Sequence, residues 1–142
     1  WRSANPTFHA VVSSLTIHHL DGAQKQQLFH DLFPMLLPGG TLVIVDLVAP
    51  TRDLGTAVAA QAWDDAVRQR SQQLDGNDNA LVRFEQLKWN LYRYPEDPAI
   101  AIDKPSGLLE QLKWLEAAGF TAVDVHWALA GHVLYSAIRP ET

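Results

Sequence analysis

The fold is decided by residues 8–50, which read FHAVVSSLTIHHLDGAQKQQLFHDLFPMLLPGGTLVIVDLVAP. Residues 8–17 and 41–50 are apolar, rich in β-branched side chains and without clean alternation, which is typical of strands buried on both faces of a parallel sheet. Between them, Asp21 and Gln24 have the spacing of a capping box, and apolar residues follow at helical spacing up to a Pro-Gly-Gly turn. A strand, a helix and a strand of this length predict two parallel strands with a right-handed crossover.

Residues 51–102 differ from the segments on either side. Their apolar residues recur at helical spacing, and the turn signal DGND at 75–78 divides them into two predicted helices. Pro95 and Pro98 end the second of these helices. The pattern predicts a helical insert between strands.

The last third of the chain predicts one helix and a β-hairpin. Ser106 is the expected N-cap of the helix, and Gly119 follows its end. Residues 121–129 and 132–138 then form two strands, and the Ala-Gly link between them is so short that only an antiparallel connection fits. Helical connections that finish in such a hairpin indicate an α/β layered sheet.

Composition and charge exclude several classes of protein. The chain has 142 residues, of which 47% are hydrophobic, and this suits one domain with a real core. The net charge is -5 and there is no basic stripe, so we expect no nucleic-acid partner. No apolar run approaches the roughly 20 residues that span a bilayer, so we expect no membrane partner. The absence of cysteine excludes disulfides and thiolate metal sites and is compatible with the cytoplasm, the location we expect.

Three passages, taken in order, resemble the C-terminal half of class I S-adenosylmethionine-dependent methyltransferases. Residues 8–20 are similar to the fourth strand and the turn after it, and residues 32–50 to the next helix end, Pro-Gly-Gly turn and fifth strand. Residues 108–140 are similar to the last helix, with its Ala-Gly-Phe exit, and the sixth and seventh strands. Together the passages cover roughly two-thirds of the chain.

The resemblance implies a partial Rossmann-like fold. The strands are expected in the order 4-5-7-6 of the family, with a final antiparallel hairpin, in a single domain over residues 1–142. Residues 51–102 would be a helical insert that could cover the acceptor. The family binds its cofactor at a Gly-rich turn after its first strand, and this chain contains no G-x-G-x-G. The resemblance therefore implies a fragment that lacks the cofactor-binding N-terminal half.

The function implied is S-adenosylmethionine-dependent methyl transfer to a small organic acceptor, performed by a full-length enzyme. The chain alone is expected to be inactive and not to bind the cofactor. Ser13, Ser14 and Leu15 would lie near the methionine portion of the cofactor, because ligands bind at the carboxyl ends of strands in α/β sheets. His18 could face the acceptor. The ordinary alternative is that one of the two adjacent histidines caps a turn and the other packs under the sheet.

His19 and Asp46 are the candidates for a general base, should the acceptor need to lose a proton. For Asp46 the alternative is a turn residue that accepts hydrogen bonds from nearby backbone. We expect no metal site, because adjacent residues on an extended segment point to opposite faces and no further His or Glu has a suitable spacing.

Aromatic and charged side chains near the end of the helical insert are candidates for substrate binding. Trp89, Tyr92 and Arg93 would suit a lid over an organic substrate. For Trp63 and Trp89 the alternative is a place in the core of a helical layer. Tyr92 and Arg93 lie nearest the breaking prolines and are expected to be exposed.

A competing hypothesis assigns no chemistry to the chain. Without strands 1 to 3 of the family, the edge of the strand at 8–17 would be bare, long and apolar. The neighbouring face would expose a larger apolar patch than is usual for a monomer. The chain would then be a non-catalytic, self-associating fragment, and we expect a homodimer through this edge or face. A third alternative is an unrelated α/β fold without a cofactor.

Overall fold

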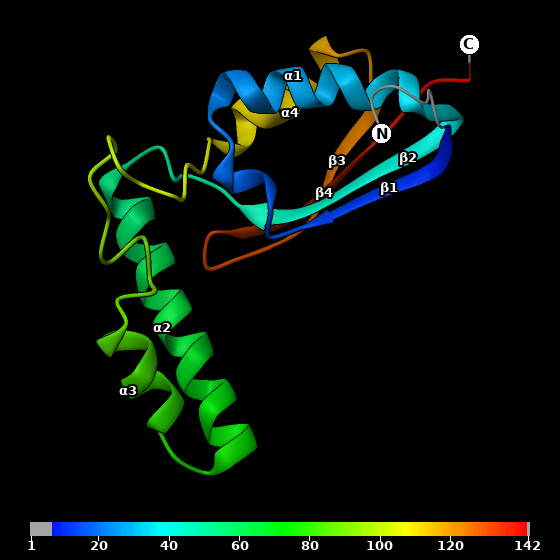
Figure 1. Ribbon diagram of the computed structural model, residues 1–142. Helices are drawn as coiled ribbons and strands as arrows, with labels where there is room; N and C mark the ends of the chain where they lie inside the picture. Colours follow the sequence, from blue (N-terminus) through cyan, green and yellow to red (C-terminus); the bar gives the residue numbers. More distant parts are fainter. Residues whose placement is uncertain (1–6, 142) are drawn as a thin grey trace.

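The computed structural model describes residues 7–141, which form a four-stranded sheet with helices on one face (Figure 1). Strand β1 pairs in parallel with β2, and β4 pairs antiparallel with both β2 and β3, in the order β1-β2-β4-β3. This confirms the predicted α/β fold, the strand order 4-5-7-6 and the final hairpin. The strands are β1 (Phe8–Ser14), β2 (Leu36–Leu47), β3 (Thr121–Leu129) and β4 (His132–Ile138).

Four helices and two short 3-10 turns connect the strands. The capping box at the start of α1 is present, because Gln24 N donates to Asp21 Oδ1 and Asp21 N donates to Gln24 Oε1, each at 2.9 Å. The helices are α1 (Gly22–Leu32), α2 (Asp53–Asp75), α3 (Asn79–Gln86) and α4 (Leu108–Ala117), and the turns are η1 (Ile17–His19) and η2 (Phe33–Met35).

The core lies between one face of the sheet and helices α1 and α4 (Figure 1). Phe29 of α1 and Leu115 of α4 are fully buried against Leu42 and Ile44 of β2. No helix of the described chain covers the other face of the sheet in the same way, and Val12 there is 70% exposed. The sheet therefore has one packed face and one open face.

Helices α2 and α3 form an arm that projects away from the sheet (Figure 1). Tyr92, which follows α3, joins the arm to the sheet: its hydroxyl lies 2.8 Å from the carbonyl oxygen of Val48 and 3.1 Å from that of Gly131. Asn90 ties the same segment to α2 by donating to Ala60 O. The two helices predicted over residues 51–102 are present, but the second ends at Gln86 and not at Pro95, because the chain leaves helical backbone at Lys88, where φ is 53°. The segment after α3 packs back toward the sheet.

Other boundaries differ from the prediction as well. Strand β1 ends at Ser14 and not at residue 17. Strand β2 begins at Leu36 and not at residue 41, because Pro34 ends α1 early and the turn η2 leads straight into the strand. The N-cap of α4 is Gly107 and not Ser106, and the Gly107 amide donates to Glu110 Oε2. The Ser106 hydroxyl is used elsewhere, as described below. No helix in residues 7–141 is long and apolar enough to cross a membrane.

Candidate functional site

Both histidines of the segment at 17–19 lie on the turn η1, directly after the carboxyl end of β1. Leu15 takes a positive φ of 48° as the strand ends, and its amide continues the pairing with β2 through Val45 O at 2.9 Å. The turn buries the side chain of His18 and leaves that of His19 47% exposed. The expectation of an extended segment here was wrong, and with it the conclusion that the two rings point to opposite faces.

His18 and Asp46 form a buried pair. Asp46, at the carboxyl end of β2, is 1% exposed, and its Oδ1 lies 2.5 Å from Nδ1 of His18. The other carboxylate oxygen accepts from the backbone amide of His18, and Oδ1 also accepts from Leu47 N. A carboxylate accepts hydrogen bonds only, so Nδ1 carries the proton and Nε2 of a neutral His18 is left as an acceptor.

Asp103 approaches both imidazoles from the loop before α4. Its Oδ1 lies 3.4 Å from Nε2 of His18 and 3.1 Å from Nδ1 of His19. The neighbouring residue holds the loop in place, because Lys104 N donates to His18 O at 2.7 Å. Four side chains from three distant parts of the sequence therefore meet at the carboxyl ends of β1 and β2.

A buried lysine supports this loop from behind. Lys25 of α1 has no solvent exposure, and its Nζ donates to Leu20 O at 2.6 Å, to Lys104 O at 2.5 Å and to the Ser106 hydroxyl at 2.9 Å. Burial lowers the pKa of Lys25, and the charge of Asp46 partly opposes this change. Three acceptors for three N–H groups hold the ammonium form in place.

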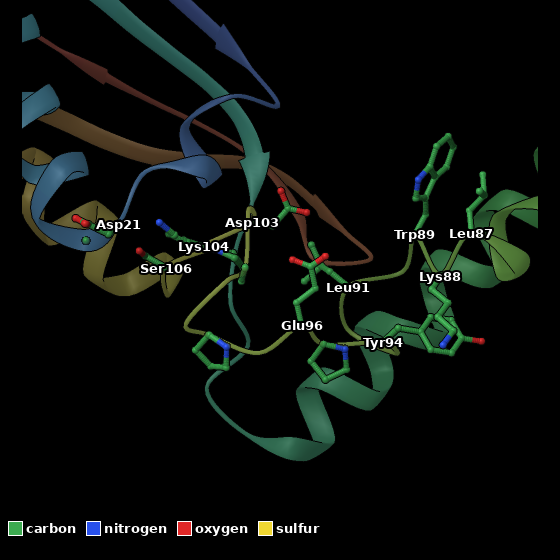
Figure 2. Close-up of a pocket in the computed structure, with 15 residues that line it drawn as sticks. Asp21, Leu87, Lys88, Trp89, Leu91, Tyr94, Glu96, Asp103, Lys104 and Ser106 are labelled. Atoms are coloured by element: carbon green, nitrogen blue, oxygen red, sulfur yellow. The ribbon is translucent and has the colours of Figure 1, made fainter.

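A pocket of about 710 Å³ opens next to Asp103 (Figure 2). Leu87, Trp89 and Tyr94 line it from the end of the arm, and Asp103 and Ser106 line it from the opposite loop. Asp103 belongs both to the pocket and to the histidine cluster, whereas neither histidine lines the pocket itself. The volume is within the range of small-molecule sites.

The substrate-binding candidates in the arm divide into two groups. Trp89 is 64% exposed and lines the pocket, so it does not take the place in a helical core that was its alternative. Tyr92 is 7% exposed, so the expectation that it lies on the surface was wrong. Arg93 is exposed but lies outside the pocket lining, since its Nε donates to Asp64 Oδ2 at 2.6 Å. Tyr92 and Arg93 hold the arm together.

The residues predicted to contact the cofactor lie at the carboxyl end of β1. Ser14 and Leu15 are exposed, and Ser13 is half-buried. The chain has no Gly-rich turn after a strand that could hold the nucleoside and ribose, so a complete cofactor site needs groups from outside these residues.

Sequence reasoning missed Lys25 and Asp103. Nothing in their local spacing distinguishes them from surface charges, because their partners lie far away along the chain. A signal existed only for Lys25: it stands one residue after Gln24 of the capping box, on the side of the helix that starts the apolar stripe.

Comparisons with known proteins show which solved structures share this fold. No protein-family model matches the chain, and no curated protein does. Among solved structures, a protein described as a possible exported protein from Bordetella parapertussis superposes with a TM-score of 0.60 at 20% identity, over 98% of this chain and 42% of that chain. The S-adenosylmethionine-dependent methyltransferase SibL gives 0.56 at 16% identity, over 95% and 32%. An O-methyltransferase family 2 protein from Planctomyces limnophilus, solved with apigenin, gives 0.54 at 17%, over 94% and 31%.

The chain therefore has the fold of the C-terminal half of a class I S-adenosylmethionine-dependent methyltransferase. It spans about a third of the length of the solved methyltransferase chains that it matches.

Proposed function

We propose that this chain is the acceptor-activating part of an S-adenosylmethionine-dependent methyltransferase that acts on a hydroxyl group of a small organic molecule. The observation that carries the proposal is the buried pair of Asp46 and His18 at the carboxyl ends of two parallel strands, with Nδ1 and Oδ1 2.5 Å apart. An imidazole oriented by a carboxylate is the usual arrangement of a general base. Several proteins of similar fold are described as O-methyltransferases.

In this proposal, His18 and not His19 is the base. Nε2 of His18 would take the proton that the acceptor hydroxyl loses when its oxygen is methylated. Asp46 holds the Nδ1–H tautomer and stabilises the imidazolium that forms. The cofactor, when bound, supplies the methyl group on a sulfonium, and Ser13, Ser14 and Leu15 would contact its methionine end.

The pocket between the arm and the loop is the proposed acceptor site. It is lined by the indole of Trp89 and the ring of Tyr94, and Asp103 connects it to His18. Aromatic walls with a few polar groups suit a flat organic molecule that carries a hydroxyl group. The O-methyltransferase family 2 protein of similar fold was solved in complex with a small organic molecule, apigenin, which supports this size class of ligand.

The first experiment is calorimetry of this chain with S-adenosylmethionine and S-adenosylhomocysteine. Binding in the micromolar range would mean that a second chain or this chain itself completes the cofactor site. No binding at millimolar cofactor would assign the chemistry to a longer protein, and the transfer assay would then use the product of the complete gene.

The second experiment measures methyl transfer from labelled cofactor to a panel of phenols and catechols. His18→Ala should lower kcat by about 10²–10⁴-fold, because the proton then has no acceptor. Asp46→Asn keeps the shape of the pair but favours the wrong tautomer, and should also lower kcat. His30→Ala, on the exposed side of α1, is the control. Equal activity of the His18 and His30 variants would overturn the role of His18.

A second candidate function is self-association without chemistry. Within residues 7–141 no strand pairs with the outer edge of β1, where Val12 is 70% and Phe8 41% exposed. An apolar groove of about 340 Å³ lies beside it, lined by Phe8, Ala10, Val11, Leu28, Leu32 and Met35. A second copy of the chain could pair along this edge in a two-fold arrangement.

Sedimentation at increasing concentration separates the two candidates. Self-association predicts a dimer that Val12→Lys disrupts, because a charge on an edge opposes strand pairing. Val82→Lys, at a residue 47% exposed on α3, should leave the dimer intact. A monomer at high concentration would count against this candidate.

A further inference from the structure

Two histidines and an aspartate converge beside the pocket. His18, His19 and Asp103 each place one possible ligand atom within 4.8 Å of those of the other two, and Asp103 Oδ1 contacts Nε2 of His18 and Nδ1 of His19. The two imidazoles share a side of the turn η1, with ring centroids 4.1 Å apart, because the turn is a 3-10 helix and not an extended strand. The geometric reason for expecting no metal site therefore does not hold.

A neutral His18 makes an unfavourable contact that a cation would relieve. Its Nδ1 proton points at Asp46, so Nε2 presents a lone pair. That lone pair faces Oδ1 of Asp103 at 3.4 Å, and a carboxylate oxygen is also an acceptor. Two acceptors in contact repel one another unless a proton or a metal ion lies between them.

Two of the three separations suit a metal ion with tetrahedral geometry, and the third, between the imidazole nitrogens, is within 4.8 Å and would shorten when an ion binds. Oδ1 of Asp103 is 3.4 Å from Nε2 of His18 and 3.1 Å from Nδ1 of His19. Bonds of about 2.0–2.1 Å at a tetrahedral angle place two ligand atoms about 3.3–3.4 Å apart. Asp46 completes the arrangement, because a histidine that binds a metal commonly donates its other N–H to a carboxylate.

We propose that His18, His19 and Asp103 bind a divalent transition-metal ion of the Zn²⁺ or Co²⁺ class. Two imidazoles and one carboxylate favour these ions over Mg²⁺ and Ca²⁺, which prefer oxygen ligands. Three protein ligands leave one position of a tetrahedral ion open. The His19 and Asp103 side chains are 47% and 39% exposed, so an ion can enter from solvent.

A metal ion at this site would regulate the proposed reaction. Ion and proton compete for the same lone pair on Nε2 of His18, so the bound ion removes the base. This consequence rests on the proposed function. The binding of the ion does not, and it can be measured on the chain alone.

The binding test is a titration of the chain, first cleared of metal with a chelator, with Co²⁺. The visible absorption of tetrahedral Co²⁺ should rise to one equivalent per chain. Zn²⁺ should displace Co²⁺ and abolish the absorption, whereas Mg²⁺ should not. Failure to bind millimolar Co²⁺ would overturn the inference.

Variants locate the bound ion. His19→Ala and Asp103→Asn remove partly exposed ligands and should each weaken Co²⁺ binding at least about 10-fold. Asp46→Asn should weaken it about 10–100-fold through the orientation of His18. His30→Ala should bind as the unaltered chain does. Equal affinity in all these variants would mean adventitious binding at surface histidines, with Asp103 only an ion-pair partner.

A last experiment separates the metal site from the proposed function. In a protein that transfers methyl groups, Zn²⁺ should inhibit transfer and a chelator should restore it. Bound Zn²⁺ with full activity would leave the metal site standing and remove His18 as the base. Absence of metal binding, with activity lost in His18→Ala, would overturn the metal site alone.

Discussion

Lys25 connects the start of α1 with the loop that carries Asp103. Its ammonium group is fully buried and meets two carbonyl oxygens and the hydroxyl of Ser106. A buried cation is tolerated only where its hydrogen bonds are satisfied. We therefore regard Lys25 as a positioning residue, which acts on the site through the backbone of residues 104–106.

Lys25→Met should destabilise the chain by about 1–3 kcal/mol. Methionine has a similar length but leaves three acceptors without a donor in a buried place. Urea unfolding followed by circular dichroism measures the change. Lys113→Met, at an exposed position on α4, is the matched control and should change the stability by less than about 0.5 kcal/mol. Equal midpoints for the two variants would contradict this account.

The site residues show which parts of a site can be read from sequence. His18, His19 and Asp46 could be chosen because each stands at the end of a recognisable strand. Their roles could not be predicted from sequence. Which histidine pairs with Asp46 depends on the 3-10 turn, which directs His18 toward that carboxylate. Asp103 was missed because its partners come from the other end of the chain.

At the scale of elements, the arm and the sheet meet at one crowded point. The turn between β3 and β4 has positive φ at both Ala130 and Gly131, 53° and 76°. This is the backbone that a two-residue hairpin requires. A Cβ at Gly131 would overlap the ring of Tyr92, whose hydroxyl lies close to the carbonyl oxygens of Val48 and Gly131.

Gly131→Ala should therefore destabilise the chain by about 2–5 kcal/mol. About 1–2 kcal/mol comes from the left-handed backbone and the rest from overpacking against Tyr92. Gly76→Ala tests the first contribution alone, because Gly76 has a φ of 67° and nothing within 4 Å of its Cβ position. Thermal unfolding of both variants measures the difference. A similar loss of stability in both variants would show that the contact of the new methyl group with Tyr92 does not destabilise the chain.

The elements themselves were largely predictable. The capping box, both parallel strands, the arm helices and the hairpin follow from local patterns. The end of α1 was not predicted, because its apolar pattern continues past Pro34 although the helix does not. The N-cap of α4 was missed because Ser106 turns toward Lys25, a preference set by tertiary contact.

The stability of the whole molecule at alkaline pH depends on two buried phenol groups, those of Tyr92 and Tyr135. Burial is the main cause that raises the pKa of Tyr92 and of Tyr135 above the ordinary 10.0, and the charge of Asp46 raises both further. In the unfolded chain these groups ionise near 10.0, so above that pH the folded state binds more protons than the unfolded state. Stability is full below pH 10 and falls as the pH rises further.

The expected slope is a loss of up to about 1.4 kcal/mol per pH unit for each phenol. Burial lowers the pKa of Lys25. Its contribution to stability therefore increases with pH, but only up to the pKa of 10.5 that it has in the unfolded chain. Free energies of unfolding measured above pH 10.5 thus report on the phenols. Tyr135→Phe should reduce the slope by about half and leave the slope at neutral pH unchanged. An unaltered alkaline slope would contradict the role of Tyr135.

The hydrogen bond from Lys25 to Lys104 O joins residues that are 79 positions apart. During synthesis the turn η1 and helix α1 therefore leave the ribosome well before the loop at residues 103–106. During that interval the cation of α1 has only Leu20 O as a protein partner, and His18 lacks its contact with Asp103. A chain interrupted before Asp103 would retain the histidines and Asp46 but would lack Asp103 and the pocket wall that it forms, so the site cannot assemble until this loop has been synthesised.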